Sequence, residues 1–106
     1  MRESTVEAHL KSEVAKAGGT TRKWVSPGRN NVPDQIVIWP RVRTKKKKGY
    51  VVKYYVAEIH FVETKAPKKD ARPGQKREHK RLRDMGCTVL VIDTKDGVDE
   101  YVGANK

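Results

Sequence analysis

Two carboxylate positions, each beside an apolar strand-like run, constrain this chain more than any other feature of its sequence. Asp34 follows a proline and precedes the largely β-branched run 35–39, whereas Glu63 and Lys65 close a longer β-favouring run. Side chains two residues apart on a strand point to the same face of a sheet, so Glu63 and Lys65 should lie side by side. If neighbouring strands bring Asp34 to them, the three side chains form a small site for a metal ion and a water molecule.

Basic residues dominate the charge of the chain. Its 106 residues include 24 Lys and Arg against 13 Asp and Glu, and this formal net charge of +11 favours a polyanionic partner, nucleic acid above all. Of the 24, 16 fall within residues 41–53 and 65–83, an asymmetry that indicates phosphate contacts rather than a merely solvated surface. The residues that we predict to contact DNA are Lys45, Lys46, Lys47, Lys48, Lys76, Arg77 and Lys80.

Length and composition limit the other classes of protein. The chain is long enough for one small domain, which we place over residues 1–106 with a basic hairpin or insertion around 41–53. No apolar run approaches the roughly 20 residues that span a bilayer, so we expect no membrane partner. The lone Cys87 cannot form an internal disulfide and fits a reducing, cytoplasmic setting.

Periodicity, propensity and turn signals predict two helices and four strands. A helix that bridges the third and fourth strands permits a mixed sheet with helices packed on it. We therefore predict an α/β fold, a small mixed β-sheet flanked by helices in the order α-β-β-β-α-β. The predicted elements are a helix over 4–17, strands over 21–26, 35–39 and 50–65, a helix over 73–85 and a strand over 88–92.

Several boundaries depend on single residues. Ser4 and Glu7 have capping-box spacing at the start of the first helix. Pro40 should end the second strand and lead into a basic turn region, and Met85 should face the sheet from the end of the second helix. The tail from Asp93 shows no decisive pattern.

The chemistry of the predicted site suits Mg²⁺ or Mn²⁺, which prefer hard oxygen ligands. Asp34 and Glu63 supply carboxylates, and the main-chain carbonyl of Thr64 supplies a third oxygen. Lys65 could orient the attacking water or offset charge that develops on a phosphate. The competing interpretation is that Asp34 is an ordinary turn residue and that Glu63 and Lys65 form a simple pair on an exposed strand.

Two further polar residues are candidates for the same site. Gln75 lies on the packing stripe of the second helix near its start, where a polar side chain needs a partner such as a phosphate or a bound water. A purely structural glutamine is the alternative. Glu7 flanks the apolar stripe of the first helix and could be a further carboxylate, although its capping-box spacing explains it without function.

The ordered set of these residues resembles the virus-type replication–repair nuclease domain (VRR-Nuc), a branch of the PD-(D/E)xK superfamily. The resemblance spans Glu7, Pro33-Asp34, the 63–65 segment, Gln75 and the segment 86–92. It implies a restriction-endonuclease-like core in which Asp34, Glu63 and Lys65 are catalytic and Glu7 and Gln75 assist. Stand-alone family members resemble dimeric nucleases that act on branched DNA, including four-way junctions.

We therefore expect a Mg²⁺- or Mn²⁺-dependent DNA endonuclease, selective for branched DNA and homodimeric through the run 50–61. A small unfused domain of this kind is typical of phage genomes, which implies the host cytoplasm as its place of action. The alternative from another class is a non-catalytic basic nucleic-acid-binding protein, which explains the charge but not the acidic cluster. A sequence-specific restriction-type nuclease is disfavoured because the chain has little room for a base-reading module.

Overall fold

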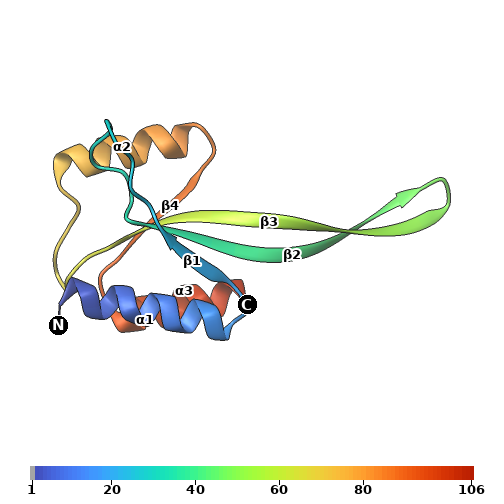
Figure 1. The fold of residues 1–106 in the computed structure, drawn as a ribbon, viewed down its shortest axis with the longest axis horizontal. Helices are drawn as coiled ribbons and strands as arrows, with labels where there is room; N and C mark the ends of the chain where they lie inside the picture. The colour runs from blue at the N-terminus through green and yellow to red at the C-terminus, as the bar shows by residue number, and fades with distance from the viewer. Residues whose placement is uncertain (1) are drawn as a thin grey trace.

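A four-stranded mixed sheet separates two layers of helices in the computed structural model, which describes residues 2–106 (Figure 1). The strand order is β1-β2-β3-β4, with β1, β2 and β3 antiparallel and β4 parallel to β3. This arrangement confirms the predicted α/β class and mixed sheet. The elements are α1 (Glu3–Lys16), β1 (Thr20–Lys23), β2 (Gln35–Lys47), β3 (Tyr50–Thr64), α2 (Pro73–Asp84), β4 (Thr88–Ile92) and α3 (Lys95–Asn105).

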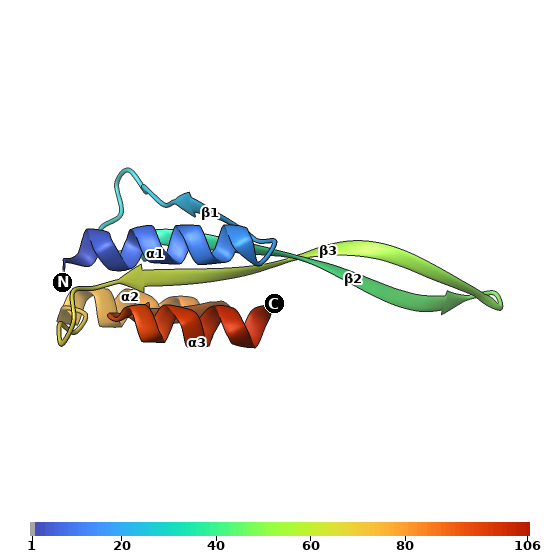
Figure 2. The same ribbon diagram turned by 90° about the horizontal axis from the view of Figure 1, so that it is seen from below.

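The hydrophobic core lies between the sheet and the layer formed by α1 and α3, which run side by side in Figure 2. The predicted apolar stripe of α1 is fully buried there. It packs on alternate residues of β2 and β3, as expected for strands that bury one face. The core residues are Val6, Leu10, Val14, Val37, Trp39, Val62, Ile92, Val98, Tyr101 and Val102.

The helix α3 was not predicted, so the full order is α-β-β-β-α-β-α. Thr94 caps its N-terminus by accepting a hydrogen bond from the backbone N–H of Gly97. Val98, Tyr101 and Val102 then form a buried stripe with the i, i+3, i+4 spacing of an amphipathic helix. A threonine followed by this stripe was the signal that could have revealed the helix.

Helix ends account for two wrong predictions. Helix α1 begins at Glu3 with Arg2 as N-cap, so Ser4 lies inside the helix and no capping box with Glu7 forms. Helix α2 begins at Pro73 as predicted and buries Leu82. Met85 follows the last helical residue, however, and its side chain is 73% exposed instead of facing the sheet.

Strands β2 and β3 continue far beyond the body of the sheet as a two-stranded hairpin, which we call the arm (residues 40–57; Figure 1). The prediction that Pro40 ends the second strand is wrong. Strand β1 accompanies β2 only as far as Ile38, so Pro40 lies where β2 has a free edge and its missing N–H is tolerated. The turn is Lys48-Gly49, and both residues have positive φ, as a tight hairpin turn requires.

The two faces of the arm differ in chemistry because paired residues share a face and neighbours along a strand alternate. One face, here the basic face, combines cations with tyrosines. The opposite face, here the apolar face, is largely uncharged. The basic face carries Arg41, Arg43, Lys45, Lys47, Tyr50, Val52, Tyr54 and Val56, and the apolar face carries Pro40, Val42, Thr44, Lys46, Val51, Lys53, Tyr55 and Ala57.

Candidate active site

Strand pairing places Asp34 directly opposite Glu63 at the end of the sheet that lies farthest from the arm. Gln35 pairs with Val62, and Asp34 is the next residue outward on its side. The backbone N–H of Thr64 donates to Asp34 Oδ1 at 3.0 Å, and the Thr64 hydroxyl donates to Oδ2 at 2.7 Å. Both oxygens of Asp34 are therefore held in one orientation.

Glu63 is the most enclosed carboxylate of the site, only 3% exposed. Its Oε2 atom accepts a hydrogen bond from Gln75 Nε2 at 3.1 Å and lies 3.3 Å from Lys65 Nζ. Its Oε1 atom is buried and has no hydrogen-bond partner within residues 2–106. A buried oxygen without a partner costs stability, and a cation is the partner that a carboxylate surrounded by other carboxylates requires.

Glu3 supplies a third carboxylate that the sequence analysis missed. One oxygen from each of Glu3, Asp34 and Glu63 lies within 4.8 Å of the others. Glu7, which we expected here, instead accepts a hydrogen bond from Gln35 Nε2 at 2.5 Å. The available signal was that Glu3 precedes Glu7 by one helical turn and so shares its face of α1.

Negative charge on all three carboxyl groups of the cluster at once is electrostatically unfavourable. Burial is the main cause that raises the pKa of Asp34, and its hydrogen bonds from Thr64 offset this only in part. Burial, and then the charge of Asp34, raise the pKa of Glu63, while Lys65 acts in the opposite direction. A divalent cation would relieve both effects, since it favours the ionised form of each carboxyl.

A cleft of about 470 Å³ opens beside these groups. Glu63, Lys65 and Gln75 line it, so the structure brings these three predicted residues together. Lys69 and Arg72, two cations that the sequence analysis did not assign to the site, line it as well, together with the acidic Glu3 and Asp70. The arrangement combines carboxylates that could hold a metal ion, one ammonium group and cations suited to a phosphate.

Gln75 is fixed in place by both ends of its amide. Its Oε1 atom accepts a hydrogen bond from the backbone N–H of Arg72, and its Nε2 atom reaches Glu63. The prediction that Gln75 points inward near the site is confirmed, with Glu63 as its partner. Two further polar residues of α2, Glu78 and His79, are also buried.

The basic residues that we predicted to contact DNA fall into two groups. Lys45 to Lys48 are exposed in the outer arm, far from the cleft. The other three are exposed on α2, where Lys76 pairs with Asp70 and Lys80 pairs with Asp84, each at 2.7 Å. Arg77 is also exposed.

A second cluster that could hold a metal, formed by His9, Glu13 and Asp99, lies between α1 and α3. His9 Nε2 is 2.7 Å from Asp99 Oδ1, and its Nδ1 is 4.0 Å from Glu13. These contacts connect the two helices, and each charged group already has a protein partner. The cluster is therefore explained by helix packing.

Comparison with known proteins supports a nuclease of this architecture. A provisionally named nuclease, p44 of Acyrthosiphon pisum secondary endosymbiont phage 1, is 43% identical over 96 residues, covering 91% of this chain and 87% of the phage protein. A solved structure described as a VRR_NUC domain superposes with a TM-score of 0.74 at 30% identity and covers 98% of this chain and 97% of its own. No protein-family model matches the chain.

The fold is that of a nuclease of the PD-(D/E)xK superfamily. Together with the two relatives, it places this chain in the VRR-Nuc family of nucleases. Among residues 2–106, no helix is long and apolar enough to cross a membrane.

Proposed function

We propose that this protein is a Mg²⁺- or Mn²⁺-dependent endonuclease that hydrolyses phosphodiester bonds in branched DNA. The observation that carries the proposal is the buried, unpartnered Oε1 of Glu63, a member of a cluster of three carboxylates beside a cleft that Lys65, Lys69 and Arg72 help to line. A hard carboxylate oxygen that has no hydrogen-bond donor, such as Glu63 Oε1, suits a divalent cation. The surrounding lysines and arginines suit the polyanion that such a cation would help to cut.

The ligands of the cation would be Asp34, Glu63 and Glu3, with the main-chain carbonyl of Thr64 as a further oxygen. When bound, the cation supplies Lewis-acid activation of the scissile phosphate and lowers the pKa of an attacking water. Thr64 holds Asp34 in its orientation, and Gln75 does the same for Glu63. These fixed positions preorganise the site before the substrate arrives.

Lys65 is the positively charged side chain that the protein places at the reacting phosphate, in addition to the metal ion. Its ammonium group lies 3.3 Å from Glu63, and its side chain is 12% exposed. From this position it orients the attacking water or stabilises the negative charge that grows on the phosphoryl oxygens. Lys69 and Arg72 at the border of the cleft bind the neighbouring phosphates.

A non-catalytic basic protein is the second candidate, and the net charge of +11 alone would support it. Such a protein gains nothing from carboxylates in its DNA-binding cleft, because they repel phosphate. Cleavage assays with and without a chelator separate the two functions. Loss of all cleavage on adding chelator, with binding retained, supports the nuclease.

Branched DNA is the proposed substrate because the basic residues lie in three separate places: the border of the cleft, α2 and the arm. The several duplex segments of a junction or flap can contact separate places together. A panel of linear, flap and four-way-junction DNAs, incubated with Mg²⁺, tests this. The expected result is faster cleavage of branched forms, and equal rates on linear duplex would contradict it. Action in the host cytoplasm follows if the gene is carried by a phage.

A homodimer is proposed because the apolar face of the arm is exposed in the single chain. Tyr55 is 85% exposed, Val51 65% and Val42 58%. Exposed apolar patches of this kind tend to be partner surfaces, and most small homo-oligomers close with two-fold symmetry. Two copies would also place two active sites on the two strands that must be cut at a junction.

Tyr55→Lys should convert the dimer to a monomer, because it places a charge within the apolar face. Light scattering at micromolar concentration measures the mass directly. Tyr54→Lys is the matched control, since it adds the same charge on the basic face and should leave the mass unchanged. A monomeric wild-type protein that still cuts both strands of a junction would contradict the dimer.

Glu3→Gln should raise the Mg²⁺ concentration needed for half-maximal cleavage by at least about tenfold, since even outer partners of metal ligands change metal affinity by that factor. Glu7→Gln is the control on the same face of α1 and should change it less, because Glu7 contacts Gln35 and not the cluster. A larger effect at Glu7 would restore that residue to the ligand set.

A further inference from the structure

The arm has no role in the core of the fold and points away from the active site. Its outer residues are exposed on both strands, and they extend the molecule to 52 Å along its longest axis. An exposed two-stranded ribbon is only marginally stable by itself, so a structure of this length in so small a chain requires an explanation.

The basic face of the arm presents cations and aromatic rings in alternation. Lys45 Nζ lies 5.4 Å from the centre of the Tyr54 ring, a cation–π contact that holds the lysine on this face. Arg43 is more than half exposed and lies 3.9 Å from Glu58. No acidic residue occurs between positions 41 and 57, so the outer part of this face is purely positive.

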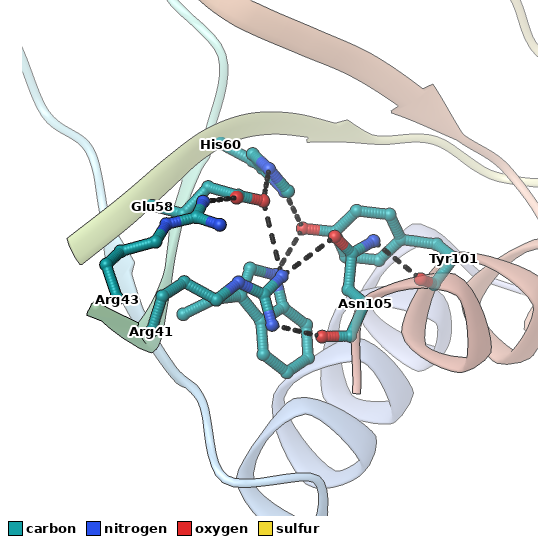
Figure 3. Close-up of polar contacts among 7 residues, drawn as sticks. Arg41, Arg43, Glu58, His60, Tyr101 and Asn105 are labelled. Carbon is teal, nitrogen blue, oxygen red and sulfur yellow. Dashed lines mark hydrogen bonds and ion pairs between the residues drawn. The ribbon is translucent and has the colours of Figure 1, made fainter. Parts of the chain in front are cut away.

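The root of the arm is fixed to the body of the protein by a partly buried polar network (Figure 3). Arg41 donates to the main-chain oxygen of Asn105 at 2.6 Å and to Glu58 at 3.2 Å. His60 joins Glu58 at 2.9 Å and Tyr101 at 2.6 Å. Figure 3 shows these side chains meeting where the strands leave the sheet, so the arm projects in a defined direction.

The proton arrangement in this network is self-consistent. The indole N–H of Trp39 donates to the Tyr101 hydroxyl at 2.9 Å, and the hydroxyl proton is then directed at His60 Nδ1. The remaining N–H of His60 donates to Glu58. Burial raises the pKa of Tyr101 to about 12, so the hydroxyl keeps its proton. Satisfied networks of this kind make a buried region rigid.

The length of the arm determines how far its outer lysines lie from the active site. Lys45 and Lys47 lie 11 and 13 residues beyond Asp34 on the same continuous chain segment. At about 3.3 Å per residue, the separation is roughly 35–45 Å. Duplex DNA rises about 3.4 Å per base pair, so this distance equals roughly 10–13 base pairs, or about one helical turn.

The arm also twists along its length. In Figure 1, β2 and β3 exchange places between the body and the tip, so the outer part of the basic face is rotated relative to its root. A twisted ribbon does not keep one face on one side along its whole length, so alternation alone does not put the outer lysines on the side away from Glu63.

We propose that the basic face of the arm is a second DNA-binding site, which grips the backbone of a duplex arm about one helical turn from the bond that is cut. The enzyme therefore selects substrates whose duplex is long enough to reach Lys45 and Lys47. The part of this proposal that concerns the cut bond depends on the proposed nuclease function. The binding of duplex DNA by the basic face does not depend on it.

The first test compares two double variants that remove the same charge from opposite faces. Lys45→Ala/Lys47→Ala alters the basic face, and Lys46→Ala/Lys53→Ala alters the apolar face. Binding to a 24-base-pair duplex is measured in chelator at several salt concentrations. The basic-face variant should lower the log–log salt slope by about 1.8, two phosphate contacts at about 0.9 each, and the apolar-face variant by less than half of that. Equal losses in both variants would overturn the proposal.

The second test varies the DNA. Junctions with arms of about 4, 8, 12, 16 and 20 base pairs are bound in chelator and, separately, cut with Mg²⁺. Wild-type affinity should rise until the arms reach roughly 12 base pairs and then level off, whereas the basic-face variant should gain nothing beyond about 8. Affinity that is independent of arm length would overturn the proposal. Absence of cleavage by the wild type would contradict the nuclease function alone, because the binding data use no metal.

Discussion

Asp34→Asn or Glu63→Gln abolishes DNA cleavage, with a loss of about 10³-fold or more, while DNA affinity stays at the wild-type value or rises. Each substitution removes a charged ligand from the metal site, and the remaining oxygens cannot hold a divalent cation tightly. Affinity does not fall, because an ionised carboxylate repels phosphate. Single-turnover cleavage and metal-free binding measure the two effects separately. Near wild-type cleavage by either variant would show that the site is wrongly placed.

The same two variants, although they lose cleavage, should be more stable than the wild type at neutral pH without metal. Their melting temperature therefore serves as a control for correct folding. Burial raises the pKa of both carboxyls. A carboxyl with a raised pKa in the folded state contributes stability at low pH, and that contribution is lost as the pH rises through the folded pKa. At neutral pH without metal, Asp34→Asn and Glu63→Gln should therefore melt above the wild type. Added Mg²⁺ should raise the melting temperature of the wild type and change theirs much less.

Lys65→Ala lowers the turnover of bound DNA by about 10²–10³-fold, the usual cost of removing one group that stabilises charge in the transition state. Binding should change by much less, because Lys69 and Arg72 remain at the border of the cleft. The rate at saturating DNA and the dissociation constant in chelator are the two measurements. An equal loss in rate and in affinity would make Lys65 a simple phosphate anchor.

Lys65→Arg refines this prediction. The ammonium group sits 3.3 Å from Glu63 with its side chain largely buried, so a wide planar guanidinium does not fit the same place. We expect little recovery of the rate. Full recovery by arginine would indicate that only the charge of residue 65 matters, and not its position beside the cluster.

The parts of the site that lie on strands were predictable from the sequence. The period of two residues puts Glu63 and Lys65 on one face, and strand pairing brings Asp34 opposite Glu63, as the apolar runs beside them suggested. Gln75 was also predictable, because a polar residue on a packing stripe needs a partner. The local sequence pattern is sufficient to predict the position of a side chain where the secondary structure itself fixes the direction in which that side chain points.

The parts that depend on packing between distant segments were not predictable. Glu3 reaches the cluster because α1 begins near the end of the sheet where Asp34 and Glu63 lie (Figure 2), whereas the sequence analysis named Glu7 on this helix and not Glu3. We predicted that the second strand ends at Pro40, because nothing in the sequence shows that β1 pairs with β2 only as far as Ile38 and leaves a free edge beyond it. The distribution of Lys45, Lys46 and Lys47 over two different faces likewise requires the register of the hairpin.

The most direct measurement is the position of a bound cation. Crystals grown with Mn²⁺ and measured at the manganese absorption edge should give an anomalous peak between Asp34 and Glu63, about 2.0–2.2 Å from their carboxylate oxygens. The cluster of His9, Glu13 and Asp99 is the internal control, since it also has three potential ligands. A peak at Glu63 that disappears in Glu63→Gln is the result predicted here. A peak only at His9, or none at either cluster, would contradict a metal-dependent active site at Asp34 and Glu63.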